Sequence, residues 1–260
     1  MTAPDMFLWS EVVLLWAIGN YSVRDPTNDP DEKRDIRFWK RAEIWHGLVI
    51  IRSVAATLLT WAICRSSALS LLVLAGSITL PLLRSRIPAR RTAELEIAAT
   101  VAFLIVSWEL ITFRHLRAVW GLLPAPLSES RTTTVMFIAA AAVFVVHGGT
   151  FIVRGILDKS GALPKLERSG TVPSQVKDVD VAELNRGRLI GALERLLLLA
   201  VVIAGSYEAL AFLMAAKGLI RSKDLEDRAW AEYFLVGSLA SVLVALFAGL
   251  GAQYAVKTFW

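Results

Sequence analysis

Cysteine and histidine are scarce in this sequence, and their scarcity narrows the chemistry that the chain can perform. A single cysteine, Cys64, excludes a disulfide within the chain and a zinc site built from cysteine ligands. The three histidines do not form a spacing typical of a metal site. We therefore expect no metal and no cofactor.

Catalytic and phosphate-binding motifs are also missing. The sequence contains no Walker loop, no His-Glu-x-x-His, no Gly-x-Ser-x-Gly and no paired aspartates of the kind used by intramembrane aspartyl proteases. No catalytic residue is predicted, which favours a protein that is not an enzyme. An integral-membrane enzyme acting on lipid is the least favoured alternative.

Hydrophobic residues, by contrast, make up 55% of the chain, and the mean hydropathy is +0.55. They gather in long runs, several of which reach the roughly 20 residues that a helix needs to cross a hydrocarbon core about 30 Å thick. The sequence therefore predicts an all-α integral membrane protein, a polytopic bundle of about eight (seven to eight) transmembrane helices. The expected segments are 6–21, 44–63, 68–83, 95–113, 135–153, 189–204, 207–220 and 230–256.

The Lys and Arg residues lie almost entirely between these runs, which indicates membrane topology and argues against a nucleic-acid partner. With eight helices, most of the 28 basic residues fall on one side, including the loop with Arg84, Arg86, Arg90 and Arg91. Because basic loops stay in the cytoplasm, we expect a multi-pass protein of a bacterial inner membrane with both termini outside. If the segment 207–220 is re-entrant, the chain crosses one time fewer.

The stretch 155–187 contains glycine, proline, serine and charged residues without a helical or strand period. It predicts a flexible cytoplasmic linker. The chain then divides into an N-terminal transmembrane part of about five helices (1–154), the linker (155–187) and a C-terminal three-helix module (188–260).

Charged residues inside the last three expected helices are the most informative polar feature. Glu194 lies twelve residues before Ser206 and Lys217 lies eleven residues after it, so two antiparallel helices bring both groups to nearly one depth. Glu232 lies a similar short distance inside the last helix. We expect an intramembrane polar layer of Glu194, Arg195, Lys217 and Glu232, flanked by Arg188 and Arg228.

Two interpretations of this polar layer stay open. It is either an ion-pair staple that locks three helices, with Arg195 extending to lipid headgroups, or an ion path or site for an anionic ligand. A second charge pair is expected in the N-terminal part, where Arg52 is predicted to pair with Glu11 or Glu109.

Small residues also predict close helix packing. Gly148-Gly149 lets two helices approach closely, and a run of small residues lines the last helix, including the pair Gly237 and Ser241. This face packs either within one chain or between chains, so a homo-oligomer stays an alternative.

Three segments carry a family resemblance: Gly-Arg-Leu-Ile-Gly-Ala-Leu-Glu-Arg at 187–195, Phe-Leu-Met-Ala-Ala-Lys at 212–217 and Ala-Glu-Tyr-Phe-Leu-Val-Gly-Ser at 231–238. They resemble the closing region of a bacterial polytopic membrane protein family grouped as domain of unknown function 3307. The N-terminal part departs from that family, which tends to carry His and then Gly-Asp-Phe where this chain has Ala17 and Gly19-Asn20-Tyr21. The resemblance implies a membrane fold and gives weight to the polar layer, but it implies little about activity.

These features favour a channel or membrane-permeabilising effector with a charged cavity, for example in stress or phage defence. An ion or small-solute transporter and a structural or adaptor subunit of a membrane complex are the alternatives. The expected partners are membrane lipids and a cytoplasmic protein docking on residues 155–187, together with a second copy if the chain is a homo-oligomer.

Overall fold

The computed structural model describes residues 3–22, 36–114, 116, 129–162, 181–220 and 228–259. The helices are α1 (Ala3–Tyr21), α2 (Ile36–Cys64), α3 (Ser67–Arg86), η3 (Ala89–Arg91), α4 (Thr92–Arg114), α5 (Glu129–Val143), η4 (Phe144–Gly148), α6 (Gly149–Ser160), α7 (Val181–Ile203), α8 (Tyr207–Ile220) and α9 (Arg228–Phe259). The all-α class predicted from the sequence is confirmed for these parts of the chain.

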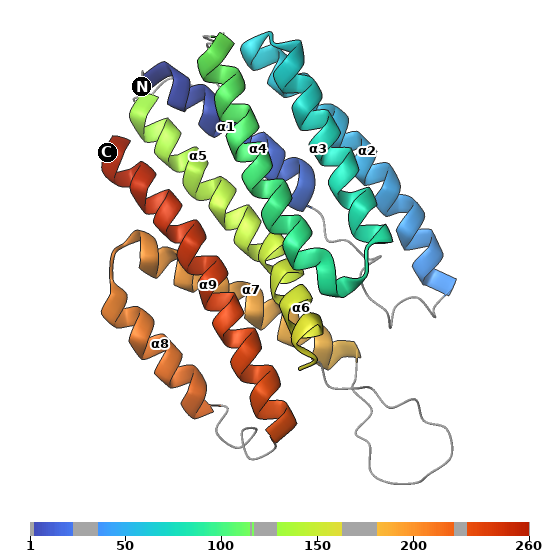
Figure 1. Cartoon of the computed structure of the whole chain (residues 1–260), viewed down its shortest axis with the longest axis vertical. Coiled ribbons are helices and arrows are strands. Elements are labelled where there is room, and N and C mark those ends of the chain that lie inside the picture. Colours follow the sequence, from blue (N-terminus) through green and yellow to red (C-terminus); the bar gives the residue numbers. More distant parts are fainter. Residues whose placement is uncertain are drawn as a thin grey trace.

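The helices form one bundle (Figure 1). α2, α3 and α4 lie side by side on one flank, and α5, η4 and α6 continue one another as a single rod. α9 packs along that rod, α7 crosses α9 obliquely, and α8 lies at the periphery. The first and last helices place the two chain ends at the same end of the bundle.

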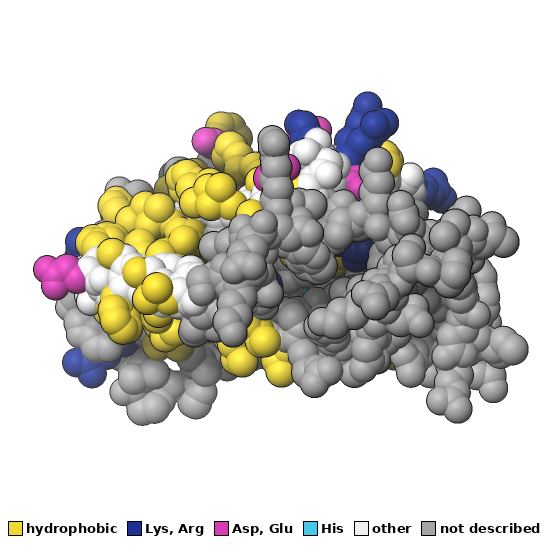
Figure 2. Space-filling view, turned by 90° about the horizontal axis from the view of Figure 1, so that it is seen from below, with side chains coloured by type: hydrophobic (Ala, Val, Ile, Leu, Met, Phe, Trp, Pro, Cys, Tyr) yellow, Lys and Arg dark blue, Asp and Glu magenta, His cyan; other side chains and the backbone are white. Residues whose placement is uncertain are grey.

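Among the residues that the structure describes, five helical stretches are long and apolar enough to cross a membrane. They are Gly47–Cys64, Ser67–Arg86, Ala89–Arg114, Arg131–Ser160 and Ala231–Lys257. Their outer faces expose large hydrophobic side chains, such as Ile51 (67%) and Phe247 (71%). Figure 2 shows such side chains covering one flank of the molecule. Because a soluble protein rarely exposes so much contiguous apolar surface, we conclude that this is a helical membrane protein.

α1 lies in the middle of the bundle, although its apolar stretch Met6–Tyr21 is short. It contacts α2, α3, α4 and α5, and Leu8 and Val12 are completely buried. Trp16 stacks on Phe103 of α4 with ring centroids 4.5 Å apart. The neighbouring helices, rather than lipid, therefore surround most of this helix.

α2 and α3 form a hairpin whose weak point is Pro81, inside α3. Proline has no N–H, so the carbonyl of Ser77, four residues earlier, loses its helical donor. The hydroxyl of Ser53 on α2 donates to that carbonyl at 3.3 Å. A side chain of the partner helix thus replaces the hydrogen bond that proline removes.

The small residues of α9 pack inside this chain. A Cβ on Gly249 would lie 2.6 Å from Cγ1 of Val202 on α7, and one on Gly237 would lie 3.6 Å from Leu157 on α6. This part of the small-residue face is therefore occupied by helices of the same chain.

The predicted division into two transmembrane parts needs two corrections. α6 continues to Ser160 and α7 already begins at Val181, so both ends of the expected linker are helical. One hydrophobic cluster also joins Val145 and Ile152 of the rod to Leu199 of α7 and Val244 of α9. The C-terminal helices share a core with the N-terminal ones, because packing α9 on the rod buries apolar surface on both.

Candidate functional site

Arg84 and Glu96 form a completely buried ion pair between α3 and α4, with side-chain exposures of 1% and 0%. Nε of Arg84 donates to Oε1 of Glu96, and Nη2 donates to Oε2 at 2.9 Å. This two-bond geometry is the strongest that an arginine and a carboxylate can adopt. Arg84 therefore does not belong to the loop in which the sequence analysis placed it.

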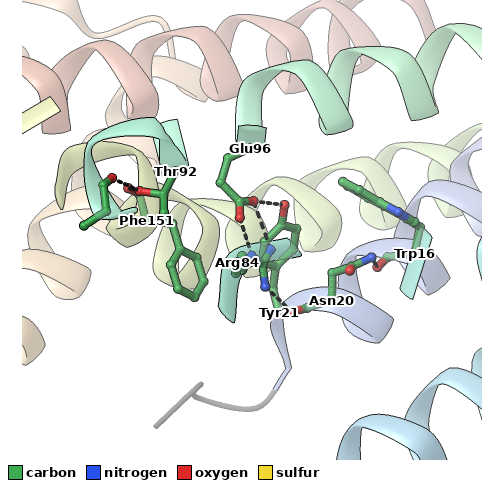
Figure 3. Close-up of polar contacts among 8 residues, drawn as sticks. Trp16, Asn20, Tyr21, Arg84, Thr92, Glu96 and Phe151 are labelled. Carbon is green, nitrogen blue, oxygen red and sulfur yellow. Dashed lines mark hydrogen bonds and ion pairs between the residues drawn. The ribbon is translucent and has the colours of Figure 1, made fainter. Parts of the chain in front are cut away.

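Further groups complete this buried centre (Figure 3). The hydroxyl of Tyr21 on α1 donates to Oε2 of Glu96 at 2.8 Å, and Nη1 of Arg84 donates to the Asn20 carbonyl at 3.4 Å. The guanidinium carbon lies 4.3 Å from the ring centroid of Phe151 and 5.0 Å from that of Tyr21. The centre joins four helices, and its charges are compensated by each other and by neighbouring groups.

Arg195 forms a second polar centre, against the π-helical turn η4 in the rod. Nε donates to the Val145 carbonyl at 2.6 Å, and Nη2 donates to the Val146 carbonyl at 3.1 Å and to Oγ1 of Thr150 at 2.6 Å. A π turn departs from regular helical hydrogen bonding, and the guanidinium donates to the carbonyls at this irregularity. Only 4% of Arg195 is exposed, so it does not extend to headgroups as the staple interpretation expected.

Gly149 makes room for this arginine. A Cβ at this position would lie 3.1 Å from both Cδ and Nε of Arg195. The glycine pair noted in the sequence therefore lets an arginine side chain approach the rod.

Glu194 and Lys217 form the third centre, between α7 and α8, with 2.5 Å from Nζ to Oε2. Their side chains are 31% and 25% exposed, and Nζ of Lys217 also lies 5.5 Å from the ring centroid of Phe234 on α9. The depth argument from the sequence placed these two groups together, and the structure does the same.

A tight turn sets the register of this hairpin. Gly205 has φ +70°, its N–H bonds to the Val202 carbonyl at 2.9 Å, and the N–H of Ser206 bonds to the Val201 carbonyl at 3.1 Å. This is a Schellman motif, in which glycine favours the left-handed conformation. The turn reverses the chain at once and aligns α8 against α7.

Of the other expected members of the polar layer, Arg195 lies apart from this pair. Arg195 follows Glu194 in α7 but projects toward the rod, since successive helical residues point about 100° apart. Glu232 is exposed on α9, two residues before Phe234. Arg188 and Arg228 lie on α7 and α9, and their side chains fall outside the described part of the structure.

The structure does not place Arg52 next to Glu11, its expected partner. A Cβ at Gly19 of α1 would lie 3.7 Å from Cβ of Ala56 on α2, so these two positions lie side by side at the same height along the helix axes. Glu11 precedes Gly19 and Arg52 precedes Ala56 along the chain. Because α1 and α2 run antiparallel (Figure 1), these two residues lie above and below that contact, on opposite sides of it. At 1.5 Å per residue they are roughly 18 Å apart along the helix axes.

Glu109 does not meet Arg52 either. Trp9 of α1 donates to Ser107 of α4 at 3.0 Å, which places Glu109 at the level of the N-terminal half of α1, where Glu11 also lies. Glu109 is exposed on α4, whereas Glu11 is completely buried. The three charges therefore occupy separate places in the bundle.

Chemically, the three centres are ion pairs and arginine–carbonyl contacts. Within the residues described, no group of three or more His, Cys, Asp and Glu side chains could hold a metal ion. Comparison with protein-family models, curated proteins and solved structures finds no match for this chain.

Proposed function

We propose that the chain is an inner-membrane protein whose C-terminal hairpin, α7 and α8, gates the permeation of ions. The observation that carries this proposal is the Glu194–Lys217 pair, which is partly exposed between two apolar helices. The eight-crossing topology with both termini outside belongs to the same proposal.

The energetics of this pair favour a gate. An unpaired charge in the middle of a membrane helix costs at least about 2.5 kcal/mol, so both groups prefer a partner or water. A quarter or more of each side chain is exposed, so water can reach both charges once the hairpin opens. The pair therefore holds the hairpin closed, and separated charges would favour a water-filled path.

The size of α8 supports the same proposal. Its 14 residues extend about 21 Å, so as a crossing helix it spans the roughly 30 Å of a hydrocarbon core only where the bilayer thins or water enters. Its side chains Phe212 and Leu219 are 71% and 75% exposed. A short peripheral helix can move without unpacking the rod and α9.

The test is ion and dye efflux from liposomes that contain the purified protein. We expect low efflux from the parent and higher efflux from Lys217→Met and Glu194→Gln, because each change opens the pair. Lys257→Met, which replaces an exposed lysine near the end of α9, is the matched control and should behave as the parent. Equal efflux from all four proteins would contradict gating by this pair.

A structural or adaptor subunit is the second candidate. It is favoured by the compensated Arg84–Glu96 centre and by Arg195, whose donors are engaged by the rod. This candidate predicts one stoichiometric protein partner that copurifies through residues 155–187 and no efflux from any variant. Loss of that partner on replacement of residues 163–180 by a Gly/Ser linker of equal length would support it.

A further inference from the structure

A recess of about 280 Å³ opens between α3 and α4, and none of its lining residues belongs to the three polar centres. Its lining is almost wholly apolar, and the stacked rings of Trp16 and Phe103 contribute to it. Gly76 deepens the recess, since a Cβ there would lie 2.9 Å from Nε1 of Trp16. Such a lining suits a hydrocarbon chain.

The recess runs along both helices. α3 and α4 form an antiparallel hairpin (Figure 1), with Leu83 and Leu95 at one end of the lining and Leu72 and Val106 at the other. On each side the first and last of these residues are eleven positions apart, which is about 16 Å along the helix. That length is close to half of a hydrocarbon core about 30 Å thick.

Three exposed arginines lie at the turn that joins α3 to α4: Arg86, Arg90 and Arg91. Arg86 lies three residues after Leu83, and Arg91 lies four residues before Leu95, so both share a helix face with the lining. None of the three makes an ion pair within the described part of the chain, and nearby Glu94 is already paired with Lys159.

From this juxtaposition we infer that the α3–α4 recess is a binding site for an anionic phospholipid. One acyl chain lies in the recess, and the phosphate contacts Arg86 and Arg91. Charge complementarity selects the occupant, because a zwitterionic headgroup gains less from a cluster of arginines than an anionic one. The site does not depend on the proposed gate.

The probe is a nanodisc that contains equal amounts of phosphatidylglycerol and phosphatidylcholine, with bound lipid counted by native mass spectrometry. We expect the parent to retain phosphatidylglycerol preferentially. Arg91→Gln should lower that retention about fivefold, the usual contribution of one arginine near an anionic surface. Ala102→Phe, which places a ring in the recess, should abolish it.

Two matched controls distinguish binding at this site from a general electrostatic attraction of anionic lipid to the protein. Ala98→Phe places the same ring on an exposed position of α4 outside the lining, and Arg114→Gln removes an exposed arginine from the other end of α4. Both should retain phosphatidylglycerol as the parent does. Equal retention of the two lipids, or an equal loss in Arg114→Gln and Arg91→Gln, would overturn the inference. Thermal unfolding in phosphatidylcholine alone checks that all variants are folded.

Discussion

Arg84–Glu96 and Lys217–Glu194 are the same kind of ion pair in two different surroundings. The side chains of the first pair are at most 1% exposed, and the pair also contacts the Tyr21 hydroxyl of α1 and the Phe151 ring of α6. The second is 25% and 31% exposed and lies between α7 and a peripheral helix. The comparison teaches that charge in a membrane helix is not by itself a functional signal. Its surroundings decide whether it holds helices together or is free to respond.

The largest effect is expected from breaking the buried pair. Glu96→Gln leaves Arg84 without its counter-charge and should lower the free energy of unfolding by about 3–5 kcal/mol. The double variant Arg84→Met/Glu96→Leu should recover most of this loss, since apolar groups of similar size replace a buried pair well. Denaturant unfolding in detergent measures both. If Glu96→Gln is as stable as the parent, this centre does not hold the four helices together.

Arg195→Met should have the next largest effect. It removes three donated hydrogen bonds to the rod and should cost roughly 1.5–3 kcal/mol, because the η4 carbonyls lose a charged donor. Thr150→Val removes the contact from Arg195 and the hydroxyl's own bond to the Val146 carbonyl at 2.9 Å, but it leaves the two bonds from Arg195 to the η4 carbonyls. It is the matched control and should cost about 1 kcal/mol. The same unfolding measurement applies, and equal losses in the two variants would contradict the assigned role of Arg195.

α7 packs tightly against α9, whereas α8 lies at the periphery, and two glycine substitutions in α9 test this difference. Gly249→Ala should cost about 1–3 kcal/mol, because its new Cβ collides with Val202. Gly251→Ala, two residues later, meets nothing within 4 Å and should leave stability unchanged or slightly higher. Thermal unfolding of the two alanine variants compares them directly. No difference between them would mean that α7 is as loosely held as α8.

The smallest effect on stability in detergent is expected from Lys217→Met, at less than about 1 kcal/mol. Glu194 is 31% exposed, so water reaches its carboxylate in detergent and the substitution leaves no deeply buried bare charge. Detergent unfolding of this variant beside Glu96→Gln tests the comparison itself. Equal losses would make both pairs structural.

The hairpin pair could be predicted because it depends only on the helical rise. Glu194 and Lys217 lie at similar distances from a turn, and antiparallel helices then bring them to one depth. The length and apolar character of the helices predicted the all-α bundle in the same way. Both arguments use local geometry and need no knowledge of which faces pack.

Arg84 was misplaced because a count of basic residues treats an arginine at a helix end as part of the loop. The buried positions Val73, Ser77, Leu80 and Arg84 follow one helical stripe of α3, and this periodicity was the available signal. Its partner Glu96 could not be found from spacing, because a turn of unknown geometry separates the two. The contact of Arg195 with η4 could not be predicted from the sequence either, since no residue pattern here indicates a π-helical turn.

The most direct test of the proposed gate is efflux from liposomes with the charge-swapped variant Glu194→Lys/Lys217→Glu beside Lys217→Met and the parent. The swap keeps the ion pair and reverses its polarity, so its efflux should return most of the way to the low level of the parent. Raised efflux from Lys217→Met together with near-parent efflux from the swap would support a gate held by the pair. Parent-level efflux from all three proteins would contradict it.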